Sequence, residues 1–305
     1  MSTEYIHFTA KQKEAARQTD LVALLQSQGE HLKRSGKEYV WRDGSEKVTV
    51  RGNLWFHQYE RIGGDAVDFV RRFYNMDFPQ AVNFLLGNNG GALPQAEPVK
   101  REPPKPFTLP PKNDNMRRVY AYLLNRRGID REVLSAFVHK GMIYESADYH
   151  NAVFVGYDEH GIARHAHKRG TGSESTYKGN AENCDPRYSF HWTGTDNTLY
   201  LFEAPIDMLS FISLHKENWR SHSYAAACCV GDQVLFQMLK ANPNIDTVCL
   251  CMDNDAAGQA ANKRISDKLF IQGIKHEILV PEFKDWNEDL LCDEQEETEC
   301  QTLQL

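Results

Sequence analysis

The chain has 305 residues, of which 41% are hydrophobic and 25% are charged, so it can build a globular core and is not disordered throughout. The formal net charge of −7 is uneven, because residues 181–305 hold 9 basic and 21 acidic residues while residues 116–180 hold 10 basic and 7 acidic ones. The sequence lacks an apolar run near the ~20 residues of a membrane span and begins without the pattern of a secretory signal, so we expect a cytoplasmic protein with no membrane contact.

Proline indicates how the chain is divided. Seven of the 12 prolines fall between Pro94 and Pro111, which is typical of a semi-rigid linker. We therefore predict five regions in chain order: a small module at 1–90, a Pro-rich linker at 91–115, a basic subdomain at 116–195, an acidic domain at 196–291 and an acidic tail at 292–305.

The first module has the pattern of a small α+β fold. Asp20 can cap a helix over residues 21–25, and Asp65 can start a second helix whose apolar residues share one face. Three short strands are predicted between them, at 39–41, 47–50 and 53–57. Trp55, Phe56 and Tyr59 in this module could stack on nucleic-acid bases, but their apolar neighbours favour a place in the core.

The basic subdomain is predicted to be mixed α+β. A helix is expected at 119–124, and Asp130 caps a second one that runs to residue 137. Strands at 152–155 and 163–167 are joined by a polar turn, which predicts a hairpin.

From residue 198 the pattern alternates regularly between strand and helix. Strands are expected at 199–202, 224–230, 248–252 and 277–280, with helices at 205–215, 233–241 and 256–271. Alternation of this kind implies right-handed crossovers and a parallel sheet with helices on both faces. The fold class is therefore α/β in this domain, preceded by the mixed α+β subdomain and the small α+β module.

Carboxylates stand at three strand ends of this domain. The first strand ends in Glu203, the third in Asp253 and Asp255, and the last leads to a polar segment that contains Asp285. Ligands of open parallel sheets bind at the carboxyl ends of the strands. Because strand side chains alternate, Asp253 and Asp255 leave on the same side, where a hard cation such as Mg²⁺ would neutralise them.

This set of residues resembles the Toprim domain, which bacterial primases, topoisomerases and some nucleases share. The resemblance implies that Glu203 is the catalytic glutamate and that Asp253 and Asp255 bind metal. It also implies supporting metal-site roles for Asp285 and for Asp207, which stands where primases have a second acid. The expected cofactor is Mg²⁺ or Mn²⁺.

The likeness extends beyond this domain. Residues 120–180 resemble the basic half of a primase catalytic core, which implies that Arg164, Lys168, Arg169 and Lys178 hold nucleic acid or a nucleotide. The first module resembles the primase zinc-binding domain. Its metal cysteines are missing, since all seven cysteines occur from Cys184 onward, so we predict no structural zinc.

Ordinary structural roles remain open for each of these residues. Asp253 and Asp255 could be a solvated pair, Glu203 a helix N-terminal acid, Asp285 a loop cap, and the basic residues a solvated surface. A P-loop for nucleotide triphosphates is not found in the sequence. Asn287 stands where the family has an aspartate, and Ala204 where it has a glycine.

The leading hypothesis is a DNA primase-like protein of a mobile element that performs metal-dependent nucleotidyl or phosphoryl transfer. Its partners would be single-stranded DNA or RNA, nucleotides, and proteins of replication or mobilisation. The alternatives are a metal-dependent Toprim nuclease and a non-catalytic nucleic-acid-binding adaptor.

Overall fold

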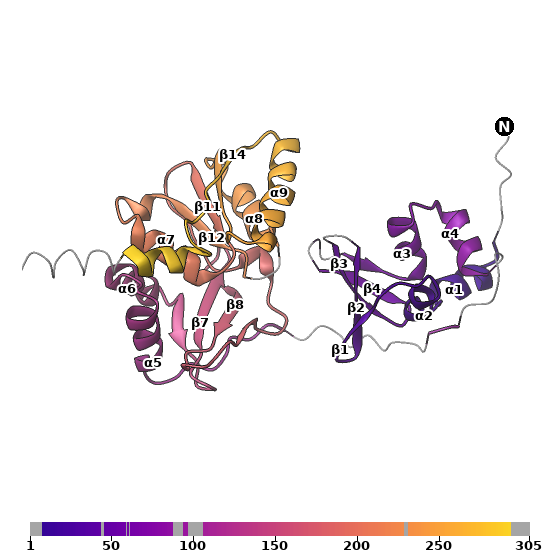
Figure 1. The fold of residues 1–305 in the computed structure, drawn as a ribbon, viewed down its shortest axis with the longest axis horizontal. Coiled ribbons are helices and arrows are strands. Elements are labelled where there is room, and N and C mark those ends of the chain that lie inside the picture. The colour runs from indigo at the N-terminus through magenta and orange to yellow at the C-terminus, as the bar shows by residue number, and fades with distance from the viewer. Residues whose placement is uncertain are drawn as a thin grey trace, which may run out of the picture. The chain divides into compact units, whose positions relative to one another are not determined.

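The computed structural model describes residues 8–43, 46–58, 60, 62–87, 94–96, 106–228 and 231–293. Tyr59, much of the predicted linker, the end of the predicted strand 224–230 and nearly all of the predicted tail lie outside these ranges. Contacts divide the chain into two compact units, residues 1–103 and 104–305. Figure 1 shows the fold of each unit.

The N-terminal unit is an antiparallel sheet covered by short helices. Its strands follow one another in chain order across the sheet. They are β1 (Lys33–Ser35), β2 (Glu38–Asp43), β3 (Glu46–Arg51), β4 (Leu54–His57) and β5 (Gly63–Gly64), and the helices are α1 (Ala10–Arg17), α2 (Leu21–Ser27), α3 (Ala66–Phe73) and α4 (Phe78–Leu85).

Helix caps set where two helices of this unit begin, and aromatic rings fill its core. Asp20 accepts hydrogen bonds from the first backbone amides of α2, and Asp65 does the same for α3, which confirms both predicted helix starts. The Trp55 ring is buried and packs edge-on against Phe69 and Phe73 of α3. Core packing thus accounts for Trp55, whereas the Phe56 side chain stays 37% exposed.

The C-terminal unit begins with helices and an antiparallel sheet. Asp130 caps α6 as predicted, and the turn at Asp158 joins β7 to β8. The elements are α5 (Arg117–Tyr120), the π-helix η1 (Ala121–Arg126), α6 (Arg131–His139), β6 (Ile143–Glu145), β7 (Ala152–Tyr157), β8 (Ala163–Arg169) and β9 (Lys178–Asn180).

The second sheet of this unit is largely parallel, in the order β10-β12-β11-β13-β14. The predicted fold class is confirmed, and the helix bounds differ from those predicted by one residue at most. The elements are η2 (Pro186–Tyr188), β10 (His191–Trp192), β11 (Thr198–Phe202), α7 (Pro205–Leu214), η3 (Trp219–Ser221), β12 (Ser223–Ala226), α8 (Gln233–Ala241), β13 (Thr247–Cys251), α9 (Ala256–Ile271) and β14 (Lys275–Ile278).

One strand of this sheet was not predicted. β10 pairs antiparallel with β12 at the sheet edge and has only two residues. A strand of that length carries no periodicity in the sequence, so only its partner in space reveals it.

Both faces of the parallel sheet are buried, as βαβ crossovers require. Leu201 and Leu250 face a core that they share with α8 and α9, whereas Phe202 and Cys251 face a core that includes α7. Figure 1 shows α8 and α9 on one side of the sheet and α7 on the other.

The second of these cores joins the two sheets of the C-terminal unit. It contains Phe137 of α6, Phe154 of β7, Phe202 of β11 and Trp286 near the chain's end. Close-packed cores resist displacement, so this shared core fixes the antiparallel sheet relative to the carboxyl ends of the parallel strands.

In the part of the chain that the structure describes, we find no helix with the length and apolarity needed to cross a membrane.

The start of α9 packs against the end of β13 at Gly258. A Cβ atom built there would lie 2.0 Å from the carbonyl oxygen of Asp253. We predict that Gly258→Ala lowers the free energy of unfolding by ~1–3 kcal/mol, because backbone must shift to relieve the clash. Urea denaturation measures the effect. Ala260→Ser, on the exposed side of the same helix, should change stability by less than about 0.5 kcal/mol. Equal stability of the two variants would contradict the packing argument.

Candidate metal and phosphate site

A cavity of about 160 Å³ opens at the carboxyl ends of β11 and β13. Both acidic and basic side chains line it. The lining residues are Arg127, Phe154, His167, Arg169, Lys178, Glu203, Ala204, Pro205, Ile206, Asp207, Asp253, Lys284, Asp285 and Asn287.

Four of the five predicted acids line this cavity. Glu203 directly follows β11, Asp207 lies in the first turn of α7, Asp253 lies just beyond the end of β13, and Asp285 comes from the segment after β14. Asp255 is the exception. Its carboxylate accepts hydrogen bonds from the amides of Ala257 and Gly258 at 2.9 Å each, so it caps α9.

Burial and the charges of neighbouring acids raise the pKa values of Asp253, Asp207 and Glu203. Burial, followed by the charges of Glu203, Asp285 and Asp255, raises the pKa of Asp253 to about 7. Burial also raises the pKa of Asp207 well above its usual value, with Asp253 the next largest cause. The pKa of Glu203 is raised by burial too, and the nearby Lys178 opposes that rise.

One carboxylate oxygen has no hydrogen-bond partner. Oδ1 of Asp253 is buried and unpaired within the described part of the chain. A buried acceptor without a donor costs about 1–3 kcal/mol, and a cation would remove that cost. The all-oxygen donor set of Asp253, Glu203, Asp207 and Asp285 fits a hard divalent ion such as Mg²⁺.

The acids share the cavity without closing on a common point. Among the described residues there is no group of three or more His, Cys, Asp or Glu side chains already placed to hold a metal ion. Mutual repulsion among unneutralised carboxylates favours such spacing.

The four predicted basic residues go to three different places. Arg169 of β8 and Lys178 of β9 line the cavity, and the two residues stand directly opposite each other on these neighbouring strands. Lys168 lines a different cavity, because neighbouring side chains of a strand point to opposite faces. Arg164 forms an ion pair with Asp158 at 2.7 Å in the turn between β7 and β8.

Sequence reasoning missed three residues of the cavity wall. His167 hydrogen-bonds Asn180 at 2.7 Å, and burial lowers the pKa of His167 to about 4, so its ring is neutral. Lys284 comes from the loop after β14. Arg127 directly follows the π-helix η1, an irregularity often found at functional sites. The adjacent basic pair Arg126-Arg127 was the only sequence signal.

Asn287 holds Arg127 in place. Its Oδ1 accepts from the Arg127 guanidinium at 2.9 Å, and its Nδ2 donates to the Arg127 carbonyl at 2.7 Å and to Ser210 Oγ at 3.0 Å. Nε of Arg127 also donates a hydrogen bond to the Tyr122 hydroxyl at 3.0 Å. The Asn287 side-chain amide therefore holds the Arg127 guanidinium near Asp207.

Comparison with known proteins gives two family matches along the C-terminal unit. Residues 121–196 match a protein family of unknown function, DUF3991, and residues 200–290 match the Toprim-like family. An uncharacterized plasmid protein of Bacillus anthracis is 26% identical over 274 residues, covering 85% of this chain and 79% of that protein. The match over residues 200–290 confirms the predicted resemblance to the Toprim family, and the Bacillus anthracis protein confirms that the chain has a relative on a plasmid.

Two solved primase structures are distantly similar. The Aquifex aeolicus primase, with its zinc-binding and RNA polymerase domains, is 16% identical and matches 96% of this chain and 84% of its own, with a TM-score of 0.40. The primase fragment of the bacteriophage T7 primase-helicase is 19% identical and matches 59% of this chain and 73% of its own, with a TM-score of 0.43.

The raised pKa of Asp253 predicts a pH-dependent stability in metal-free buffer. An acid whose folded pKa is raised favours folding most below its unfolded pKa, and that contribution is lost as pH rises through the folded pKa of about 7. His167, whose pKa is lowered by burial, acts in the opposite sense over the same range, so the effect of Asp253 is measured as the difference between wild type and Asp253→Asn. Relative to this variant, the wild type should lose stability between about pH 4 and pH 7, and Asp253→Asn should be ~1–2 kcal/mol more stable at pH 8 in EDTA.

Thermal and urea denaturation with and without Mg²⁺ measure this prediction. Magnesium should stabilise the wild type at pH 8 by mass action and stabilise Asp253→Asn much less. The control is Asp267→Asn, an exposed acid on α9, which should behave like wild type. A stability difference between wild type and Asp253→Asn that is the same at pH 4 and at pH 8, with the same response of both to Mg²⁺, would refute the prediction.

The contacts of Asn287 predict that an aspartate is unfavourable there. Asn287→Asp replaces a donor with an acceptor opposite the Arg127 carbonyl, so we expect a loss of ~1–3 kcal/mol in the free energy of unfolding. Urea denaturation at pH 7 gives the value. Glu288→Gln, at an exposed neighbouring position, is the matched control. A stabilising effect of Asn287→Asp would show that the site prefers another carboxylate to the amide.

Proposed function

We propose that this chain is a primase-like enzyme that transfers nucleotidyl groups onto nucleic acid with the help of Mg²⁺ or Mn²⁺. One observation carries the proposal. Glu203, Asp207, Asp253 and Asp285 line a single cavity together with Arg169 and Lys178. Acids for a divalent cation and bases for phosphate oxygens are the two parts that phosphoryl and nucleotidyl transfer needs.

The Toprim-like match supports this reading of the acidic wall. Toprim proteins act as nucleotidyltransferases or nucleases, and their domains generally bind Mg²⁺. The cation would be held by Asp253 together with Glu203, Asp207 and Asp285. When bound, it would neutralise phosphate oxygens and make an attacking hydroxyl more acidic.

The basic wall supports binding of a polyanion. Arg169 and Lys178 extend from β8 and β9, and Lys284 lies beside the acids on the other side. Their positive charges would orient the phosphates of a strand or of an incoming nucleotide. Arg127 is held by Asn287, and its charge lowers the pKa of Asp207. Arg127 therefore acts as a fixed internal counter-charge.

Glu203 is the best placed proton acceptor. Its side chain is partly exposed at the cavity. Its pKa is raised toward neutral pH, and a carboxylate with a pKa nearer the working pH is a more effective proton acceptor. Glu203 would take the proton of the attacking hydroxyl. His167 is neutral and hydrogen-bonded to Asn180, which in turn bonds the backbone of Cys228, so it supports the wall.

The proposed partners follow from the same arrangement. Single-stranded DNA or RNA would supply the template, and free nucleotides the substrates. The Bacillus anthracis relative is encoded on a plasmid, which supports the proposal that this chain works together with the replication or mobilisation proteins of such an element.

Primer synthesis is the direct test. The full-length protein is incubated with single-stranded DNA, ribonucleotides or deoxyribonucleotides, and Mg²⁺ or Mn²⁺, and products are resolved by gel electrophoresis. We expect synthesis by wild type and losses of roughly 10²–10⁴-fold for Glu203→Gln and for Asp253→Asn. Asp267→Asn is the control and should retain wild-type activity.

A parallel reaction without nucleotides separates synthesis from cleavage. Metal-dependent shortening of the DNA, abolished by Asp253→Asn, would identify a nuclease instead. A protein that neither extends nor cleaves while still binding DNA would refute an enzymatic function.

A further inference from the structure

A second cavity, of about 430 Å³, lies in the same unit as the acidic cavity. Its volume is within the range of small-molecule sites. It is lined by Arg118, Tyr149, Asn151, Lys168, Gly170, Thr171, Gly172, Ser175 and Tyr177. Among these residues there are two tyrosines and two cations, and no carboxylate.

The strand β8 separates this cavity from the acidic one. Lys168 lies two residues after Ala166 on β8, so both residues point to the same face of the sheet. On that face, Ala166 packs in a small core with Val153 and Val155 of β7. Arg169 points the other way, into the acidic cavity. Because adjacent strand side chains alternate faces, Lys168 and Arg169 leave β8 on opposite faces of the sheet, and the two cavities have no lining residue in common.

The loop that carries Tyr149 is held in an unfavourable conformation. Tyr149 and His150 have φ values of +60° and +52°. Left-handed backbone costs roughly 1–2 kcal/mol for a residue other than glycine, and the Tyr149 side chain, at 88% exposed, recovers nothing by burial. Strained backbone persists where the surrounding structure imposes it, and it is often found at binding sites.

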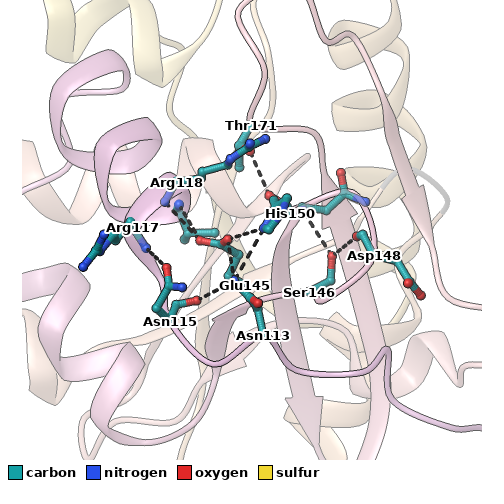
Figure 2. Close-up of polar contacts among 11 residues, drawn as sticks. Asn113, Asn115, Arg117, Arg118, Glu145, Ser146, Asp148, His150 and Thr171 are labelled. Atoms are coloured by element: carbon teal, nitrogen blue, oxygen red, sulfur yellow. Dashed lines mark hydrogen bonds and ion pairs between the residues drawn. The ribbon is translucent and has the colours of Figure 1, made fainter.

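Buried polar contacts impose this conformation (Figure 2). Glu145, whose side chain is 1% exposed, bonds His150 Nδ1 at 2.7 Å and Asn113 Nδ2 at 2.9 Å. Its other oxygen accepts from the backbone amide of Arg118 at 3.0 Å. Thr171 donates to the His150 carbonyl at 2.8 Å. One buried carboxylate therefore fixes both Arg118 and the Tyr149 loop at the cavity.

The chemistry of the lining selects a planar ligand with negative charge. Tyr149 and Tyr177 are 88% and 46% exposed, so their rings are free to stack. Lys168 Nζ lies 5.7 Å from the centre of the Tyr177 ring, which places a cation next to a stacking surface. Stacking of a base on an aromatic side chain contributes roughly 1–3 kcal/mol, and Arg118 and Lys168 supply phosphate contacts.

We propose that this second cavity binds one unpaired nucleotide, with its base on Tyr149 and Tyr177 and its phosphate at Arg118 and Lys168. The nucleotide belongs either to a single strand that continues past the β8–β9 segment or to the free pool. The site is separate from the acidic cavity, and binding there requires neither a metal ion nor catalysis.

Photocrosslinking tests the proposal directly. Full-length protein in EDTA is irradiated with an oligothymidylate that carries 5-iodouracil, and crosslinked peptides are identified by mass spectrometry. We expect crosslinks at Tyr149 or Tyr177 in wild type and in Asp253→Asn alike. Crosslinks confined to other segments would overturn the proposal, whatever the outcome of the primer assay.

Fluorescence anisotropy with the same oligonucleotide measures affinity. Tyr149→Ala combined with Tyr177→Ala should weaken binding by about tenfold or more, whereas the double phenylalanine variant keeps the rings and should stay within about threefold. Phe270→Ala, which removes another exposed ring of this unit, should have no effect. Unchanged affinity of the double alanine variant, or no binding by wild type, would overturn the proposal.

Competition identifies the source of the nucleotide. Displacement of the oligonucleotide by excess ATP in EDTA would show a site for free nucleotides, and displacement only by unlabelled oligonucleotide would show a site for a strand. Either result supports a nucleotide site only if the competitor also suppresses the wild-type crosslinks at Tyr149 or Tyr177. A competitor that displaces the oligonucleotide and leaves those crosslinks intact would overturn the proposal.

Discussion

Repulsion among carboxylates at one edge of the parallel sheet is the constraint on which the site depends. The fold places Glu203, Asp207, Asp253 and Asp285 around a single small cavity, where burial first, and then the charges of neighbouring acids, raise the pKa values of Glu203, Asp207 and Asp253. Proteins rarely bury unpaired acids together unless a cation or a reaction needs them. The unpaired Oδ1 of Asp253 is the sharpest sign of that cost.

The cost is partly offset by cations that come from a different sheet. The apolar core around Phe154, Phe202 and Trp286 holds the β6–β9 sheet against the parallel sheet. As a consequence, Arg169 and Lys178 face the acids, and the Asn287 amide fixes Arg127 beside them. The family matches divide at the same place, with one ending at residue 196 and the other beginning at residue 200. The cavity therefore depends on two matched regions packing as one unit.

Two neighbouring basic residues of the strand β8 line two different cavities. Arg169 lines the acidic cavity and Lys168 the second cavity, because side chains alternate along the strand. The segment between Gly170 and Tyr177 borders the second cavity and ends one residue before Lys178. A ligand in the second cavity would therefore contact Tyr177, the residue that directly precedes Lys178 of the acidic cavity.

The sequence alone determined the alternation of strands and helices, the caps Asp20, Asp65 and Asp130, and the acids at strand ends, because each of these depends on local periodicity or on neighbours along the chain. The Asp255 cap of α9 and the Arg164–Asp158 ion pair also join near neighbours in the chain, although the prediction assigned these residues to metal and nucleic acid. Tertiary structure decided the rest. It lined one cavity with Arg169 and another with Lys168. It also brought Arg127 to Asn287 across 160 positions of sequence. Such contacts depend on which faces meet in the folded core, and no local pattern records that.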